Sequence, residues 1–240
     1  MQHRAAGRRR TKAKPQKPSA VALIAGGVGE LLLTAGVVVL LFVVYTLWGT
    51  GIQTANAQDD LRDQLVLDVP SDPTASAAPT PPPLDELELG DAYGIIRIPR
   101  FGDDWEWIIV QGTEDSDLKN GPGHYDTSVN PGEIGNFSIA GHRAGHGEPF
   151  ARFPELRVGD TVEIETSTGT FVYQLDDAPD GDKNGNKINI RDGWVVDPVP
   201  GEPRGTEPTE RRITLTTCWP RFGSSHRMYA TGTLIGGEEL

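Results

Sequence analysis

One apolar segment near the N-terminus constrains this 240-residue chain more than any other feature. Residues 21–48 are mostly apolar and uncharged except for Glu30, and Leu31–Trp48 form a run of 18 residues without a charge. At about 1.5 Å of rise per helical residue, this run nearly crosses a hydrocarbon core of roughly 30 Å, and the Gly- and Ala-rich residues before it supply the rest. We therefore predict one transmembrane helix.

The charges beside this segment predict its orientation. Residues 1–20 carry seven Lys and Arg and no Asp or Glu. Because basic flanks stay in the cytoplasm, we expect a single-pass protein of the cell membrane, with a basic cytoplasmic tail over 1–20, a signal-anchor over 21–50 and the rest outside. A cleaved signal peptide is the alternative, since TANA at 54–57 resembles a cleavage site. The apolar run exceeds the usual core of about 7–15 residues, which favours the anchor.

The rest of the chain is strongly acidic. The formal net charge is −12, but residues 49–240 hold 15 Lys and Arg against 33 Asp and Glu, a net charge of −18. Nucleic-acid binding requires clustered Lys and Arg, so this balance argues against a nucleic-acid partner. With Cys218 as the only cysteine, no intrachain disulfide can form, and the extracellular part has to fold on its own core.

Composition divides the extracellular part into a linker and one domain. Residues 51–84 are interpreted as an extracellular Pro-rich linker, because VPSDPTASAAPTPPP at 69–83 cannot bury a core and should be extended. Residues 53–67 are a candidate for a short amphipathic helix with Leu61, Leu65 and Gln58 on one face. Residues 85–240 are predicted to form a single domain of ordinary size.

Short runs rich in β-branched and aromatic residues, ended by Gly or Pro, predict that this domain is all-β. They are Tyr93–Pro99, Trp105–Gly112, Gly135–His142, Asp160–Leu175 with a hairpin turn at Ser167–Gly169, 211–218 and 228–236. About eight strands in roughly 150 residues indicate a closed barrel or a sandwich, between which strand count alone does not choose. Gly147–Leu156 is expected to supply one helical turn.

Two reactive residues stand at the ends of predicted strands. Cys218 ends ITLTTC, and His142 ends FSIAGH, with glycines on both sides that indicate a tight exit turn. A cysteine nucleophile needs a nearby cation to stabilise its thiolate, and its partners are adjacent in the fold rather than in the sequence. We therefore expect Cys218 and His142 to meet at one rim of the domain.

These motifs resemble those of the sortases, the membrane-anchored cysteine transpeptidases of Gram-positive bacteria. TLTTC at 214–218 matches the TLxTC motif of that family, and SIAGHRAGHGEPF surrounds His142. GPGHY, AGHR, PVPG and TLTTC-x-P resemble class E, the housekeeping-type sortases of actinobacteria. The resemblance runs from Tyr93 to Gly236, and it implies a sortase-like closed eight-stranded β-barrel with short helices.

The resemblance also implies a reaction. Cys218 would attack the Thr–Gly carbonyl of an LAxTG- or LPxTG-type sorting signal and form a thioacyl enzyme. His142 would move protons at the leaving and attacking amines, and Arg227, nine residues after the cysteine, would hydrogen-bond the substrate or the oxyanion. The implied partners are surface proteins with C-terminal sorting signals and an amine of a peptidoglycan precursor. No cofactor is expected, because an amine resolves a thioester unaided.

Substrate contacts are implied at three further residues. The resemblance places at Tyr125 the tyrosine implicated in a preference for LAxTG over LPxTG, since a hydroxyl there can bond the amide N–H that alanine has and proline lacks. Thr216 and Thr217 are candidates to line the site, although threonines in strands also serve packing.

Two other functions stay open. A pilin-polymerising sortase would use the same chemistry with a lysine side chain as acceptor; such enzymes often carry a second membrane helix, which LIGGEEL at 234–240 does not provide. The other alternative is a non-enzymatic surface β-domain with an incidental cysteine.

Residues 180–192, DGDKNGNKINIRD, depart from the family pattern. Oxygen ligands stand at alternate positions, as in the first half of an EF-hand calcium loop: Asp180, Asp182, Asn184 and Asn186. The twelfth position is Arg191 instead of a bidentate Glu, and no flanking helices are evident. We therefore favour a polar turn over a calcium site.

Overall fold

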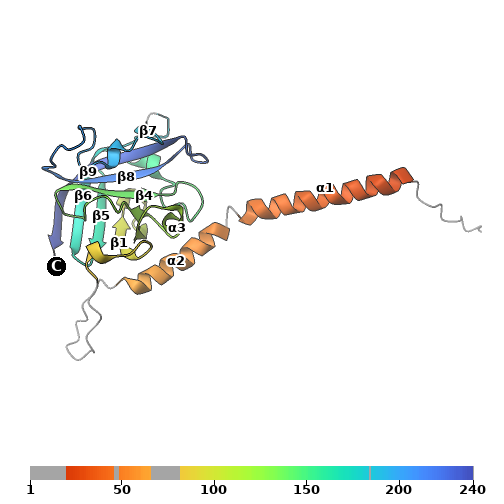
Figure 1. Cartoon of the computed structure of the whole chain (residues 1–240), viewed down its shortest axis with the longest axis horizontal. Helices are drawn as coiled ribbons and strands as arrows, with labels where there is room; N and C mark the ends of the chain where they lie inside the picture. Colours follow the sequence, from red (N-terminus) through yellow and green to blue (C-terminus); the bar gives the residue numbers. More distant parts are fainter. Residues whose placement is uncertain (1–19, 46–48, 66–81, 184, 240) are drawn as a thin grey trace, which may run out of the picture. The chain divides into compact units, whose positions relative to one another are not determined.

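The computed structural model describes residues 20–45, 49–65, 82–183 and 185–239. They fall into two units, each described by itself. The first unit, up to Val44, contains helix α1 (Ala20–Val44), and the second, from Tyr45 onward, contains all the described strands (Figure 1).

Helix α1 is the membrane candidate. Within it, Leu23–Val44 form 22 residues with a mean hydropathy of 2.4, and this is the one described helix that is long and apolar enough to cross a membrane. Its large apolar side chains, such as Leu32 and Phe42, are exposed, as lipid-facing side chains are expected to be. Of the predicted anchor over 21–50, the helix covers the part up to Val44; residues 1–19 and 46–48 lie outside the described part.

Eight strands close into a β-barrel, as predicted. Their bounds are β1 (Ala92–Arg97), β2 (Glu106–Gln111), β3 (Gly123–His124), β4 (Gly135–Gly141), β5 (Thr161–Thr166), β6 (Gly169–Asp177), β8 (Arg211–Trp219) and β9 (His226–Glu239). The ring order is β6-β5-β1-β2-β3-β4-β8-β9, and the pairing of β9 with β6 closes it. A short strand, β7 (Lys187–Asn189), pairs with the start of β9 and lies outside the ring.

The barrel interior is the hydrophobic core, because successive side chains of a strand point to opposite faces. In β5 and β6 every second residue is buried, as the alternating pattern predicts. Phe137, Ile139, Ile213 and Leu215 from β4 and β8 are fully buried in this core, and each contributes about 1.5–3 kcal/mol. Gly232 lets β9 pass from β8 to β6, since a Cβ there would lie 2.5 Å from the Gln174 carbonyl oxygen.

Strands β4 and β8 run parallel and side by side. Their register pairs Gly135 with Arg211 and continues to Gly141 with Thr217, and β9 flanks the other edge of β8 in the antiparallel sense. Since parallel strands end at the same edge of a sheet, the residues after β4 and the last residues of β8 meet at one rim of the barrel.

Several short elements were not predicted from sequence. Strand β3 has two residues and β7 has three, too few for an alternating pattern to appear. The other unpredicted short elements are α3 (Asp115–Leu118), η2 (Leu84–Glu86), η3 (Pro99–Phe101) and η5 (Trp194–Val196), whereas η4 (Phe153–Glu155) was expected. The helical turn expected within Gly147–Leu156 is η4.

The linker predicted over residues 51–84 begins too early. Thr50–Gln64 form helix α2, and Leu61 of this helix is buried against apolar residues of β1 and β2. The short amphipathic helix predicted over 53–67 corresponds to α2. The helix was thus predicted, but its apolar contact was not, because that contact comes from β1 and β2 of the barrel. The Pro-rich residues 66–81 lie outside the described part.

The side chain of Gln58 ties α2 to an edge of β2. Its Nε2 donates to the carbonyl oxygens of Ile108 at 3.0 Å and Asn120 at 2.8 Å, and the Ile108 N–H donates to its Oε1 at 2.7 Å. One amide side chain thus satisfies both backbone groups of a strand residue, as a neighbouring strand would do.

Replacing Gln58 with alanine is expected to lower the free energy of unfolding by about 2 kcal/mol, because it leaves a partly buried N–H and C=O without partners. Urea unfolding of residues 49–240 measures this change. The matched control is Gln64→Ala, an exposed glutamine at the end of the same helix, which should change the free energy by less than about 0.5 kcal/mol. Equal effects of both substitutions would show that the contact with Ile108 contributes nothing specific.

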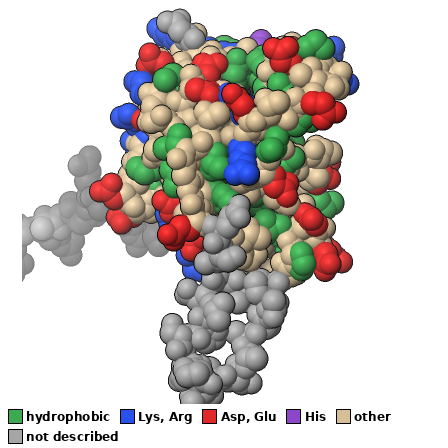
Figure 2. All heavy atoms as spheres, turned by 90° about the vertical axis from the view of Figure 1, so that its left-hand side faces the viewer, with side chains coloured by type: hydrophobic (Ala, Val, Ile, Leu, Met, Phe, Trp, Pro, Cys, Tyr) green, Lys and Arg blue, Asp and Glu red, His purple; other side chains and the backbone are tan. Residues whose placement is uncertain are grey.

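The surface of the barrel is rich in acidic groups. Figure 2 shows Asp and Glu side chains spread among uncharged ones over the face that it displays. This agrees with the net charge of −18 counted for residues 49–240.

Candidate active site

Three neighbouring strands bring His142, Cys218 and Arg227 together. Gly141 pairs with Thr217, so the next residue, His142, lies beside Cys218. On the other edge of β8, Cys218 is directly opposite Arg227 of β9. Residues opposite one another on adjacent strands place their side chains on the same face, with Cβ atoms about 4.5–5.5 Å apart. Cys218 thus stands on the middle strand, between His142 just after β4 and Arg227 on β9, and all three residues are half-buried.

The turn after β4 holds His142 through its backbone. The His142 carbonyl accepts the Phe150 N–H at 3.0 Å. The Phe150 ring packs over Gly141, where a Cβ would lie 2.5 Å from a ring carbon. The glycine before the histidine is thus required for the close approach that fixes the turn.

The surroundings of His142 favour its neutral form. Burial lowers the pKa of His142, and the neighbouring His146 lowers it further, while Asp115 acts in the opposite direction. The two imidazole rings stack with their centroids 4.8 Å apart and their planes at 27°. An imidazole whose pKa lies below its ordinary value is largely neutral near pH 7 and can accept a proton.

The face of β8 that carries Cys218 also carries Thr216. Tyr125, from the segment after β3, contacts Thr216 there. Thr216 is two residues before Cys218 and so points to the same side of the strand. Its hydroxyl lies 3.1 Å from the Tyr125 hydroxyl, and the Tyr125 N–H donates to the Ser138 carbonyl at 3.0 Å. Tyr125 therefore reaches across β4 to Thr216, two residues before Cys218 on β8.

Thr217 does not share this position. It alternates to the opposite face of β8, with the core residue Leu215, and its hydroxyl donates to the Gly141 carbonyl at 2.8 Å. The structure therefore does not support Thr217 as a residue that lines the site. Its hydroxyl instead joins β8 to the end of β4, next to His142.

The candidate calcium loop directs its two carboxylates to different arginines. Asp180 Oδ1 lies 3.0 Å from Arg157 Nε, and Asp182 Oδ1 lies 2.5 Å from Arg143 Nη2. Within the described ranges no three His, Cys, Asp or Glu side chains gather into a metal-binding group; Asn184 lies outside them. Calcium would have to compete with these ion pairs, and its binding stays a prediction.

Two ion pairs around the site were missed by sequence reasoning. Besides the pair of Arg143 with Asp182, Arg221 Nη2 lies 2.5 Å from Glu148 Oε2 and joins the turn after β8 to the turn after β4. The partners are separated by 39 and 73 residues, and no local pattern in the sequence relates them. Only the closed barrel brings them together.

This arrangement has the parts for acyl transfer through a thioester. Cys218 is a nucleophile, the neutral imidazole of His142 can accept and return a proton, and Arg227 can donate hydrogen bonds to a developing oxyanion. Their positions are set by strand pairing and not by flexible loops, which favours a preorganised site.

Comparisons with known proteins all identify sortases as similar to this chain. A family profile described as "Sortase domain" matches residues 96–235. Sortase SrtE1 of Streptomyces coelicolor is 31% identical over 233 residues, which cover 94% of this chain and 61% of that protein. Sortase SrtE2 of the same organism is also 31% identical over 233 residues, which cover 94% of this chain and 88% of that protein. The chain thus spans less than two thirds of the length of SrtE1.

A solved structure shares the fold. The structure of sortase E from Streptomyces avermitilis is 37% identical in sequence and superposes with a TM-score of 0.55. The match covers 63% of this chain and 93% of that one.

Proposed function

Because the chain belongs to the sortase family and resembles its class E members, we propose that it is a membrane-anchored cysteine transpeptidase. It cleaves an LAxTG- or LPxTG-type sorting signal between Thr and Gly and joins the substrate protein to an amine of cell-wall peptidoglycan. The observation that carries the proposal is the pairing of β4 with β8 and of β8 with β9, which sets His142, directly after β4, and Arg227 of β9 on either side of Cys218.

In the first half-reaction the Cys218 thiolate attacks the carbonyl carbon of the Thr residue. The carbonyl oxygen becomes an oxyanion, which Arg227 stabilises by hydrogen bonds from its planar guanidinium. The carbon–nitrogen bond to Gly breaks, and His142, protonated at this stage, donates a proton to the leaving amine. The product is a thioester between Cys218 and the substrate protein.

In the second half-reaction an amine attacks the thioester. His142 accepts a proton from the attacking amine, the new amide bond forms, and Cys218 leaves as the thiolate. Because a thioester reacts readily with an amine, the proposed second step does not call for a cofactor. The choice between an amine and water as acceptor decides whether the substrate is joined or merely hydrolysed.

Helix α1 supports the proposal that the protein is anchored in the cell membrane. Its length and hydropathy suit a single membrane span, and the basic residues before it favour an N-terminus in the cytoplasm with the barrel outside. A sorting signal that is itself delivered at the membrane would then meet the site without diffusing away.

The test is to incubate the purified extracellular part, residues 49–240, with LAxTG and LPxTG peptides and candidate amines. Mass spectrometry should show cleavage between Thr and Gly and a product ligated to the amine. Peptidoglycan-type amines and a lysine side-chain amine form separate arms, so that a preference for lysine would instead support a pilin-polymerising activity. No cleavage of either peptide would contradict the proposal.

Tyr125→Phe is expected to reduce the preference for LAxTG over LPxTG by about 3- to 10-fold in kcat/KM, because it removes one hydroxyl hydrogen bond to an alanine N–H. Parallel kinetics with the two peptides measure this ratio. Tyr229→Phe is the matched control, since Tyr229 faces Thr216 from the opposite strand, β9, and should leave the ratio unchanged. An unchanged ratio in Tyr125→Phe would remove Tyr125 from the specificity argument.

A further inference from the structure

We propose that Asp182 is a positioning residue for the acyl-transfer reaction. It contacts both residues that directly follow the reactive pair, Arg143 after His142 and Trp219 after Cys218, and thereby fixes the distance between imidazole and thiol. The inference rests on the proposed function and adds to it a role for the loop that departs from the sortase pattern.

The contact with Arg143 is an ion pair at a buried position. Arg143 is 5% exposed, and its Nη2 lies 2.5 Å from Asp182 Oδ1. Its Nε and Nη1 are buried and have no hydrogen-bond partner among the described residues. Asp182, whose own side chain is 57% exposed, supplies the carboxylate that pairs with this buried guanidinium, and its removal would leave the buried charge without that partner.

The contact with Trp219 uses a different atom of the same residue. Trp219 Nε1–H donates to the backbone carbonyl of Asp182 at 3.2 Å. The Lys187 ammonium lies 4.1 Å from the Trp219 ring centroid and confines the indole further. Since Trp219 follows Cys218 on β8, a displaced indole would change the direction in which the thiol points.

Asp182 can position other residues because its own loop is anchored. The Gly181 N–H donates to the Pro154 carbonyl at 2.8 Å, and the Asp180 N–H to the Leu156 carbonyl at 3.3 Å. Both acceptors belong to or adjoin η4. The loop is thus attached to a segment that is itself held by side chains.

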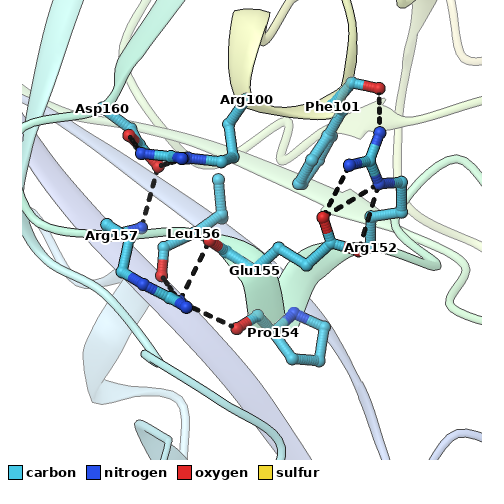
Figure 3. A network of polar contacts seen from close by, with 8 residues as sticks. All are labelled: Arg100, Phe101, Arg152, Pro154, Glu155, Leu156, Arg157 and Asp160. Carbon is cyan, nitrogen blue, oxygen red and sulfur yellow. Dashed lines mark hydrogen bonds and ion pairs between the residues drawn. The ribbon is translucent and has the colours of Figure 1, made fainter.

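Figure 3 shows how η4 and its neighbours are held. The Arg152 guanidinium bonds the Phe101 carbonyl and pairs with Glu155, with 2.6 Å between Nη2 and Oε2. Arg100 pairs with Asp160 at 2.5 Å, and Asp160 also accepts the Arg157 N–H at 2.8 Å. These contacts connect η4, η3 and the start of β5, and the loop that contains Asp182 is attached to this connected segment.

The placement of Asp182 implies an effect on rate beyond any effect on stability. A reacting group displaced by about 1 Å can lose about 10²-fold in rate, and both ends of the Cys218–His142 pair depend on this one residue. The proposed substrate contacts are Thr216 of β8 and Tyr125 after β3, whereas the polar contacts of Asp182 are with Arg143 and Trp219. A positioning role therefore predicts a loss in kcat with little change in KM.

The test compares Asp182→Asn, Asp182→Glu and Asp180→Asn in residues 49–240, by steady-state cleavage of an LAxTG peptide. Asp182→Asn keeps the backbone acceptor for Trp219 and removes the charge; kcat should fall by about 10- to 100-fold and KM should stay within about twofold. Asp182→Glu keeps the charge and should recover activity to within about fivefold of wild type. Asp180→Asn, in the same loop with an exposed partner, should stay within about twofold.

A second readout does not depend on the substrate. The rate of iodoacetamide alkylation of Cys218 at neutral pH should fall about fivefold or more in Asp182→Asn and stay unchanged in Asp180→Asn, since His142 no longer lies within reach of the thiol proton. If wild type fails to cleave the peptide but these alkylation rates differ as stated, the proposed function is wrong and the positioning role stands.

The proposal is overturned if folded Asp182→Asn keeps wild-type kcat and alkylation rate, or if activity in all variants simply follows the melting temperature. If Asp182→Asn does not fold, the double variant Arg143→Met with Asp182→Asn removes the buried charge together with its partner. This variant is expected to fold with low kcat, and a wild-type kcat in it would equally overturn the proposal.

Discussion

Cys218→Ala is expected to abolish cleavage of an LAxTG peptide, with a loss in kcat/KM on the order of 10⁴-fold or more. The proposed reaction proceeds through a covalent thioester, and alanine offers no atom to form it. Release of a fluorophore from a quenched peptide measures the loss. Cys218 is half-buried at a barrel rim, and the smaller side chain should leave the melting temperature nearly unchanged.

The composition of the chain makes the control for this substitution unusually clean. Cys218 is the only cysteine, so a thiol reagent that inactivates the wild-type protein must act there. One equivalent of label should accompany complete loss of activity, and the alanine variant should take up none. An alanine variant that retains more than about 1% of the activity would show that another group carries out the chemistry.

His142→Gln is expected to lower kcat/KM by about 10³-fold, because glutamine has a similar reach but cannot exchange a proton with the thiol or the amines. The same peptide assay measures this effect. The matched control is His146→Asn. His146 stacks on His142 at 4.8 Å, and asparagine tolerates its φ of +50°.

The control separates proton transfer from a general effect of the turn. His146→Asn removes a ring that lowers the pKa of His142 but leaves the imidazole of His142 in place, so activity should change by less than about fivefold. Comparable losses in both variants would indicate that the turn after β4, and not the imidazole of His142, limits the reaction.

The strands that could be predicted are those with a local pattern. The hairpin of β5 and β6 alternates over its full length and has a clear turn, so its residues alone place it. Strand β3 has no such pattern, and its two residues pair only because β2 and β4 lie on either side. The parallel pairing of β4 with β8, which creates the rim of the site, joins residues 76 apart and follows from closure of the barrel.

Helix α2 could be predicted from local sequence, but its packing partner could not. The spacing of Gln58 and Leu61 predicts an amphipathic helix, and the structure contains it. The sequence does not show what the helix packs against, so the bonds from Gln58 to the Ile108 backbone were not foreseeable. The polar face of a short helix gives no sign that one of its amides completes the edge of a sheet.

The candidate site was predictable to different degrees. Cys218 and His142 stand in recognisable motifs at strand ends, and the paired strands bring them together. Asp182 belongs to an oxygen-rich stretch whose spacing suggests a cation, whereas in the fold its carboxylate meets the Arg143 guanidinium. Alternation along β8 places Thr216 and Thr217 on opposite faces of the strand. Which of the two faces points into the core is known only from the closed barrel.

The central claim is that a thiol held between an imidazole and a guanidinium forms a covalent bond to the substrate carbonyl. Intact-mass spectrometry of residues 49–240 incubated with an LAxTG peptide, without an added amine, measures this bond. We expect a mass increase equal to the peptide up to its Thr, mapped to Cys218 and removed by a nucleophilic amine. Peptide cleavage by the wild-type protein without this adduct, or an adduct on another residue, would contradict the account.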